Sequence, residues 1–279
     1  MSYLNMSRQR SILKWAGSKY RILSQLLPHF PQATRLIEPF TGSGALFLNS
    51  SYSQYLLGES NLDLISLYKI LQQEGAYFIA YCKPLFTDTQ NNAYTYYNYR
   101  NEFNHCDNLH RRAALFIYLN RHGFNGLCRY NKKRYYNVPF GRYKKPYFPE
   151  KEMLLFHQKS HAATFVHADF TETFQHATKH DLIYCDPPYI TLSASANFSS
   201  YTEQKFTQNQ QILLADYAHE KSAKGIPVII SNHDTPLSRE LYAGAIMHSF
   251  PVQRFISCKS TQRNPVQELL ALFLPATFS

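Results

Sequence analysis

The chain has 279 residues, enough for one large domain or for a domain with an insertion, and its formal net charge of +10 favours a polyanionic partner such as nucleic acid, although an anionic membrane would also fit. Residues 1–10 lack the apolar stretch of a secretory signal, the apolar run at 269–274 is far too short to span a bilayer, and five scattered cysteines without a C-x-x-C pair argue against a disulfide framework or a zinc site. We therefore expect a cytoplasmic protein, a monomer or weak dimer, with no metal and no membrane contact.

Short apolar runs alternate with helical patterns along most of the chain. In chain order we predict a strand at 34–40, a tight turn at 41–44 with a helix from 45 onward, a strand at 55–59, a helix at 62–73, strands at 165–168 and 182–185, a helix at 207–224, a strand at 227–232 and a last edge strand at 268–274. Strands that alternate with helices indicate an α/β fold with a doubly wound, mixed but mostly parallel sheet of Rossmann-like type.

One segment interrupts this alternation. Between residues 100 and 145, eleven lysines and arginines stand against two acids, so the stretch carries a net charge of +9, and it is rich in tyrosine and phenylalanine. Cations neutralise phosphates and rings stack on bases, so we favour a nucleic-acid surface over the commoner solvated basic face. We divide the chain into an N-terminal catalytic part (1–67), an inserted helical and hairpin-containing recognition domain (68–150) and a C-terminal catalytic part (151–279).

A glycine turn after the first strand is typical of a nucleotide-binding site. Gly42 and Gly44 let the backbone approach a ligand closely, and Glu59, at the end of the second strand, can accept hydrogen bonds from both hydroxyls of a ribose. Phe47 stands where the G-x-G-x-x-G pattern requires its third glycine, which disfavours a nicotinamide dinucleotide. An adenosyl cofactor without a pyrophosphate fits better.

The motif Asp186-Pro187-Pro188-Tyr189 directly follows a buried strand and suggests attack by an exocyclic amine. Such an amine is a poor nucleophile because its lone pair is delocalised into the ring. The Asp186 carboxylate and the Pro187 carbonyl can hold its two hydrogens, and Tyr189 can stack on the ring. A strand that merely ends in a proline turn is the simpler alternative, and the full motif disfavours it.

Trp15, the only tryptophan, precedes Lys19 by a turn of small residues. The pattern fits a lid over a ligand carboxylate and equally a buried tryptophan at the start of a helix.

Taken together, these stretches resemble the Dam-type, D12 class DNA adenine-N6 methyltransferases, which act on GATC. The resemblance covers nearly the whole chain. It is carried by the segments 14–20 (KWAGSKY), 38–44 (EPFTGSG), 119–130 (LNRHGFNGLCRY), 137–143 (NVPFGRY) and 186–198 (DPPYITLSASANF).

The resemblance implies S-adenosylmethionine as cofactor, double-stranded DNA as partner and methylation of adenine N6 after base flipping. It places Asp186, Pro187 and Tyr189 at the reacting amine. The residues that it places at or beside the cofactor are Trp15, Lys19, Glu38, Phe40, Gly42, Gly44, Glu59, Asp169, Phe170 and Asp186.

The same resemblance assigns DNA contacts. Phe124 would enter the duplex beside the flipped adenine, and Asn125 would contact the unpaired thymine. Lys14 and Tyr143 would read the first base pair, Leu127 and Pro139 would pack on the third, and Arg129 would bind the guanine of the fourth. The residues that would hold phosphates are Arg100, Arg121, Lys144 and Ser193.

Two positions depart from the family pattern. The family often has tyrosine where this chain has Phe124, and stacking needs only the ring, so we expect the wedge to survive without the hydroxyl's bond. The family commonly has aspartate where this chain has Glu59, whose longer arm should still reach the ribose although cofactor affinity could change.

Three other functions are considered. The same chemistry could act on an amine of RNA or of protein, but the concentrated base-reading segment favours duplex DNA. A non-catalytic DNA-binding regulator is disfavoured by the intact Asp186, Tyr189 and Gly42 loop. A Rossmann oxidoreductase is disfavoured by the missing third glycine.

Overall fold

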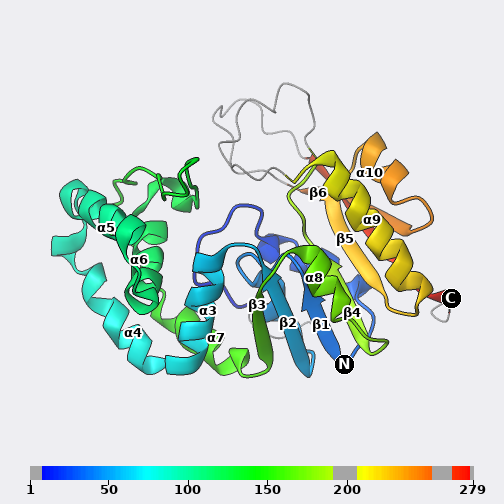
Figure 1. Cartoon of the computed structure of the whole chain (residues 1–279), viewed down its shortest axis with the longest axis horizontal. Coiled ribbons are helices and arrows are strands. Elements are labelled where there is room, and N and C mark those ends of the chain that lie inside the picture. Colours follow the sequence, from blue (N-terminus) through cyan, green and yellow to red (C-terminus); the bar gives the residue numbers. More distant parts are fainter. Residues whose placement is uncertain (1–7, 191–205, 253–265, 277–279) are drawn as a thin grey trace.

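The computed structural model describes residues 8–190, 206–252 and 266–276. Within these residues the centre is a seven-stranded sheet in the order β3-β2-β1-β4-β5-β7-β6 (Figure 1). The strands are β1 (Arg35–Glu38), β2 (Gln54–Glu59), β3 (Ala163–His167), β4 (Asp181–Cys185), β5 (Val228–His233), β6 (Ile246–Val252) and β7 (Val266–Phe273). The first five run parallel, and β7 is antiparallel to both of its neighbours. The predicted mixed, mostly parallel Rossmann-like sheet is confirmed.

Both faces of the sheet are buried, because successive side chains of a strand point to opposite faces. On β1, Leu36 belongs to the core on one face and Ile37 to the core on the other. The helices of the first face are α1 (Leu23–Leu26), α2 (Ala45–Asn49), α3 (Leu62–Glu74) and α7 (Glu150–Ser160), and those of the second are α8 (Phe170–Gln175), α9 (Gln208–Ala223) and α10 (Pro236–Leu241). The loops after the parallel strands therefore meet at one edge.

One strand assignment was wrong. The run at 268–274 was predicted as an edge strand, but β7 lies between β5 and β6 and is buried along Leu269–Phe273. A continuous apolar run is typical of a strand covered on both faces, which is what β7 is. The edge is β6, which sequence reasoning missed, and Pro251 within it is tolerated there because an edge strand can lose a ladder bond.

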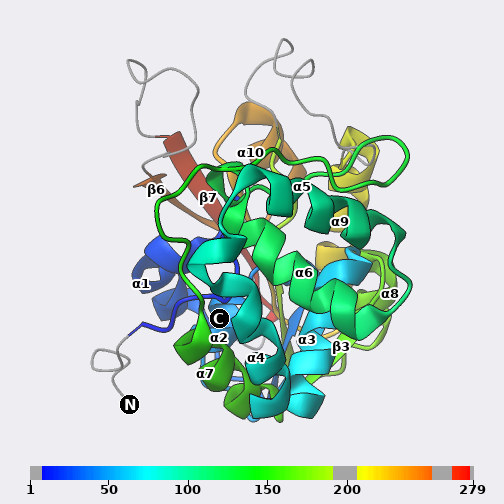
Figure 2. The ribbon, with the colours of Figure 1, turned by 90° about the vertical axis from the view of Figure 1, so that its left-hand side faces the viewer.

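A helical unit lies to one side of the sheet, as Figures 1 and 2 show. It contains α4 (Ala76–Cys82), α5 (Ala93–His105) and α6 (Leu109–His122), with short 3-10 turns at Lys83–Phe86, Asp88–Gln90 and Phe124–Gly126. Its core is continuous with the core of the first sheet face. The domain boundaries at 67/68 and 150/151 stay a prediction.

Gly75 joins α3 to α4 in a backbone conformation that residues other than glycine rarely adopt (φ +49°). A Cβ there would lie 2.5 Å from the His157 ring. We expect Gly75→Ala to cost about 1–2 kcal/mol for the left-handed backbone and a further ~1–3 kcal/mol for the overlap. Gly225→Ala is the matched control, because Gly225 also has positive φ (+85°) but no atom within 4 Å. Urea unfolding measures both, and equal losses would contradict a steric role for His157.

Candidate active site and DNA-facing loops

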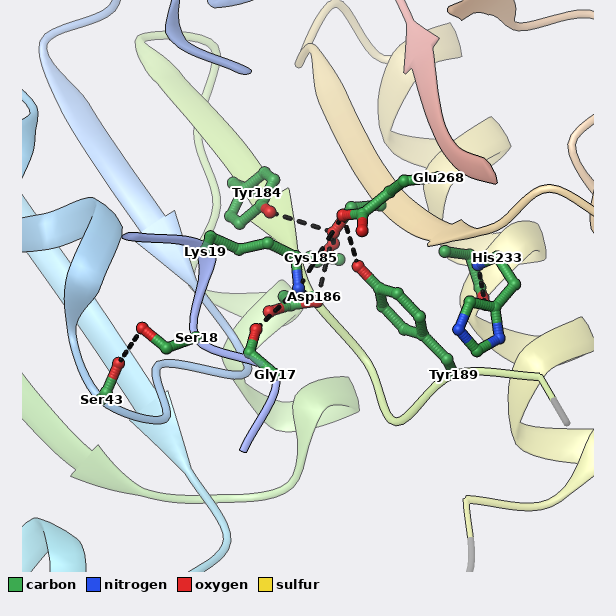
Figure 3. Close-up of polar contacts among 12 residues, drawn as sticks. Gly17, Ser18, Lys19, Ser43, Tyr184, Cys185, Asp186, Tyr189, His233 and Glu268 are labelled. Atoms are coloured by element: carbon green, nitrogen blue, oxygen red, sulfur yellow. Dashed lines mark hydrogen bonds and ion pairs between the residues drawn. The ribbon is translucent and has the colours of Figure 1, made fainter. Parts of the chain in front are cut away.

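The predicted catalytic aspartate directly follows β4 and meets a buried lysine (Figure 3). Lys19 Nζ lies 2.7 Å from Asp186 Oδ1 and donates to the Gly17 carbonyl over 2.9 Å. The Ser231 hydroxyl on β5 donates to the same Asp186 oxygen over 3.2 Å. An ammonium and a hydroxyl thus hold one carboxylate oxygen, and charge-assisted bonds of this kind fix its orientation at the sheet edge.

Tyr189 stands beside the same lysine. Its hydroxyl donates to Glu268 Oε1 on β7 over 2.7 Å, and its ring centre is 4.7 Å from the Lys19 ammonium. Burial, followed by the charges of Asp186 and Glu268, raises the pKa of Tyr189 well above its ordinary value. The phenol therefore stays protonated at neutral pH and keeps donating to Glu268.

A pair of buried amides anchors the loop between these two residues. Gln211 on α9 donates to the Pro188 carbonyl over 2.8 Å, and Asn232 on β5 accepts from the Ile190 amide over 3.1 Å. The two amides are bonded to each other over 3.1 Å. None of these bonds uses the carbonyl of Pro187, so the loop is anchored without engaging the oxygen predicted to bind the amine.

The glycine turn lies at the same edge. Glu59 accepts from the Gly42 amide over 3.1 Å and from the Asn61 amide over 3.0 Å. A Cβ on Gly42 would lie 3.0 Å from Trp15 Nε1, so the indole rests directly on the turn. Trp15 is only half-buried and precedes the first helical turn, Lys19–Arg21, which favours the lid interpretation over a tryptophan buried at a helix start.

The remaining predicted cofactor residues come together next to Glu59. The Ala168 amide donates to the Glu59 carbonyl over 3.3 Å, and Asp169 caps α8 by accepting from the Thr171 amide over 3.0 Å. Phe170 is buried and its ring stacks on Phe40, with 5.5 Å between centres. Gly44 is the residue before α2.

The loop after α6 presents the predicted wedge. Phe124 is 48% exposed, and its amide donates to the Pro139 carbonyl over 2.8 Å. Asn125 is exposed with positive φ, and its amide donates to the Tyr143 hydroxyl over 2.9 Å. The Lys14 ammonium lies 4.2 Å from the centre of the Tyr143 ring. The fold thus brings these five residues together from three distant parts of the chain.

Arg129 belongs to a small hairpin closed by the bridge between Tyr130 and Tyr136. Its Nε donates to the Asn137 side chain over 2.7 Å and its Nη2 to the Asn137 carbonyl over 3.1 Å. These bonds orient the guanidinium. The carbonyl of Leu127 accepts from the Tyr136 hydroxyl over 2.8 Å, which places the predicted base-reading residues on one supported loop.

The four predicted phosphate ligands differ in their surroundings. Lys144 is exposed, and Arg100 uses one nitrogen to donate to the Val138 carbonyl over 3.0 Å. Arg121 is buried and donates to the main-chain carbonyls of Ser11, over 3.4 Å, and of Ile12. The phosphate contact of Arg121 stays a prediction, for a side chain that is only 8% exposed. Ser193 lies outside the described residues.

The sequence profile of the D12 class N6 adenine-specific DNA methyltransferase family matches residues 15–256. This chain belongs to that family. It is 49% identical over 272 residues to a DNA adenine methylase of Vibrio cholerae serotype O1, covering 97% of this chain and 98% of the relative. It is 46% identical over 274 residues to the DNA adenine methylase of Escherichia coli K12, covering 98% and 99%.

Among solved structures, a putative RNA methyltransferase from Pyrococcus horikoshii aligns with 98% of this chain and 90% of its own at 8% identity and a TM-score of 0.37, which is too weak to support any argument. Family membership makes this D12 class protein an adenine-specific DNA methyltransferase. In the described ranges, no helix is long and apolar enough to cross a membrane. Among the same residues, no group of three His, Cys, Asp or Glu side chains could hold a metal ion.

Sequence reasoning missed several supporting residues of the D12 class site. Glu268 is the one acid of β7 and directly precedes its buried apolar run at 269–273, and an isolated acid in a buried strand is a signal that could have identified it. Ser231 and Asn232 lie near the end of β5, where the strand is still buried, and polar residues at that end of a parallel strand are a similar signal. Gln211 lies on α9, and nothing in its spacing distinguishes it from the other polar residues of that helix.

Glu38, at the end of β1, is the most unusual charge of the site. It is 3% exposed, and no group within the described part of the chain hydrogen-bonds its Oε1 atom. Burial, and then the charge of Asp186, raises the pKa of Glu38 to about 8, while the Phe47 amide and the Lys159 charge oppose the shift. Ionised Glu38 is therefore costly in the protein without ligands.

This shift predicts a pH dependence of stability. Glu38 keeps its proton in the folded state up to about pH 8. The unfolded chain releases that proton near the ordinary carboxyl value, so stability is lost as pH rises between the two values, by up to about 1.4 kcal/mol per pH unit. We expect Glu38→Gln, which cannot ionise, to gain stability over the wild type progressively across this window. Urea unfolding at a series of pH values tests this, and a constant difference would contradict the assigned pKa.

Proposed function

We propose that this D12 class enzyme methylates adenine N6 in duplex GATC, with S-adenosylmethionine as donor and with the target adenine rotated out of the helix. The position of Asp186 carries the proposal, because it stands at the same sheet edge as the Gly42 turn. The adjacent residues Trp15 and Lys14 connect that edge with the exposed Phe124–Asn125 loop. The choice of GATC is supported by the likeness of segments 119–130 and 137–143 to the DNA-reading part of GATC-specific enzymes.

The charges of the site fit such a donor. Asp186 and Glu268 share one ammonium, that of Lys19, and Glu38, whose pKa the charge of Asp186 helps to raise, has no hydrogen-bond partner for Oε1 within the described residues. A buried excess of negative charge suits a cationic ligand. When bound, S-adenosylmethionine supplies a methyl group on positively charged sulfur.

Each part of the site has a role toward this donor. Trp15 would cover it, Lys19 and Glu38 would bind its charged amino-acid end, and Glu59 would bind its ribose hydroxyls. The remaining predicted contacts, Phe40, Gly42, Gly44, Asp169 and Phe170, would line its binding site. The close approach of Trp15 to the Gly42 turn supports this arrangement, because a side chain on Gly42 would fill the space between them.

Asp186, Pro187 and Tyr189 act on the amine. The Asp186 carboxylate and the Pro187 carbonyl would accept the two N6 hydrogens and so localise the nitrogen lone pair, while Tyr189 would stack on the base. The Glu268 bond and the Lys19 contact hold the Tyr189 ring in place. Positioning of this kind can reach effective molarities on the order of 10⁵–10⁸ M, so it supplies most of the acceleration.

DNA recognition would divide between capture and reading. The basic segment attracts the duplex, with affinity that falls as salt rises. Arg129 would contact guanine O6 and N7, a bidentate pair that contributes roughly 1–3 kcal/mol of discrimination. Removing adenine from the stack costs a few kcal/mol, and stacking of an inserted Phe124 ring, about 1–3 kcal/mol, offsets part of that cost.

Methyl transfer to unmethylated plasmid tests the activity directly. With labelled S-adenosylmethionine we expect label on adenine N6 at GATC and nowhere else. Asp186→Ala should abolish transfer while DNA binding is retained, because Asp186 is assigned to the flipped base and the donor and to no contact with the rest of the duplex. Asp216→Ala, an exposed residue of α9, is the control that should retain full activity. Label at other sequences would refute the GATC assignment, and wild-type activity of Asp186→Ala would refute the catalytic one.

Arg129→Ala should relax discrimination at one base pair more than it weakens overall binding, by roughly 1–3 kcal/mol at that position. Lys144→Ala is the matched comparison: an exposed cation predicted to touch only phosphate should weaken binding to all sequences alike and reduce the salt slope by about 1. Binding to a set of singly substituted duplexes at several salt concentrations separates the two. A uniform loss for Arg129→Ala would contradict direct base reading.

A further inference from the structure

One buried amide at the end of α6 holds two segments that face different ligands. Asn120 Oδ1 accepts from the Lys14 amide over 2.9 Å, and Asn120 Nδ2 donates to the Lys14 carbonyl over 2.8 Å. The same Nδ2 donates to the Gly126 carbonyl over 3.0 Å. Asn120 is fully buried, so these bonds are shielded from water. We call residues 11–19 the N-terminal strap and residues 123–127 the reading loop.

The strap runs between the helical unit and the sheet, in dark blue in Figure 1. At Lys14 it touches the DNA-facing side, since the ammonium lies over the Tyr143 ring and the Tyr143 hydroxyl accepts from the Asn125 amide. One residue later Trp15 rests on the Gly42 turn, and Lys19 at the end of the strap pairs with Asp186. A short, continuous piece of chain therefore contacts both proposed ligand sites.

The N-terminal strap packs tightly against the reading loop. A Cβ on Gly126 would lie 2.4 Å from Lys14 Cβ, so the Gly126 backbone packs directly against the Lys14 side chain at the point where Asn120 bonds both residues. Arg121, the next residue of α6, donates to the Ser11 and Ile12 carbonyls and fixes the beginning of the strap. A displacement of the reading loop is therefore transmitted to Lys14 and Trp15 rather than absorbed between them.

We propose that Asn120 is a positioning residue that couples the reading of cognate DNA to cofactor binding. The inference rests on the proposed function and adds to it that the two ligands are bound cooperatively through the strap. DNA engaged by Phe124 and Asn125 reorients the Gly126 carbonyl. Because Asn120 bonds both residues, this movement of the Gly126 carbonyl shifts the Lys14 main chain. Trp15 and Lys19, which lie on the same strap, then move toward the cofactor. Linkage requires the effect to be reciprocal, so the cofactor equally tightens cognate DNA.

A purely structural role for Asn120 makes a different prediction, and the chain offers a matched control. Asn104 on α5 accepts from the Tyr136 amide over 2.7 Å and donates to the Tyr136 carbonyl over 3.1 Å. This is the same two-sided bond between an amide and one main-chain residue, but Tyr136 belongs to the Arg129 hairpin and not to the strap. Asn104→Ala should loosen the DNA-binding surface and leave the coupling intact.

The experiment measures the affinity for S-adenosylhomocysteine, which permits no turnover, through the emission of Trp15, the only tryptophan of the chain. Wild type, Asn120→Ala and Asn104→Ala are each titrated without DNA, with a duplex that contains the sequence methylated by the enzyme, and with a scrambled duplex of equal length. For the wild type and Asn104→Ala, we expect the cognate duplex to raise the affinity for S-adenosylhomocysteine about 5-fold or more above that with the scrambled duplex. For Asn120→Ala, the ratio of the affinities measured with the two duplexes should fall to near 1.

A cognate-to-scrambled ratio for Asn120→Ala equal to that of the wild type would overturn the proposal. So would a wild type that binds both ligands without any difference between the two duplexes, and this outcome decides the matter even if Asn120→Ala does not fold. Failure of the wild type to bind the cofactor analogue or DNA at all would instead refute the proposed function. Circular dichroism of each variant verifies that it is folded.

Discussion

The contact between the Lys19 ammonium and the Asp186 carboxylate, at 2.7 Å, is the interaction on which the rest of the site depends. Lys19 comes from the N-terminal strap and Asp186 from the end of β4, so the pair joins a loop to the sheet. A buried ion pair is costly to assemble and more costly to break on one side, since either partner alone would leave an uncompensated charge. Ser231 and Glu268 add neighbours from β5 and β7, so the sheet sets where Lys19 lies.

The same pair explains why the unliganded site is electrostatically incomplete. The two carboxylates Asp186 and Glu268 share the single ammonium of Lys19, and Glu38 holds its proton with a pKa of about 8 as a result of burial and of Asp186. A cationic methyl donor would relieve this imbalance. The cofactor side of the site therefore carries acidic side chains that would attract a cationic ligand, and the neighbouring DNA-binding side carries basic side chains that would attract phosphates.

Much of this arrangement was predictable because it is local. The apolar run before Asp186, the glycine turn after β1 and the concentration of basic and aromatic residues at 100–145 are each properties of a few neighbouring residues. Parallel strands then bring the ends of β1, β2 and β4 to one edge without further information. Non-local features were missed or misjudged. The edge position of β6 depends on which strand pairs with β7, and the burial of Arg121 depends on where the strap crosses α6.

By itself, the sequence determined the fold class and the family, because these follow from short motifs and hydrophobic periodicity. Tertiary structure alone decided that Glu268 supports Tyr189, that Arg121 donates to main-chain carbonyls near the N-terminus, and that Asn120 bonds both Lys14 and Gly126. The physical reason is that each of these contacts joins side chains to partners far away in the chain. Which partner a buried polar group finds is settled only when the core closes around it.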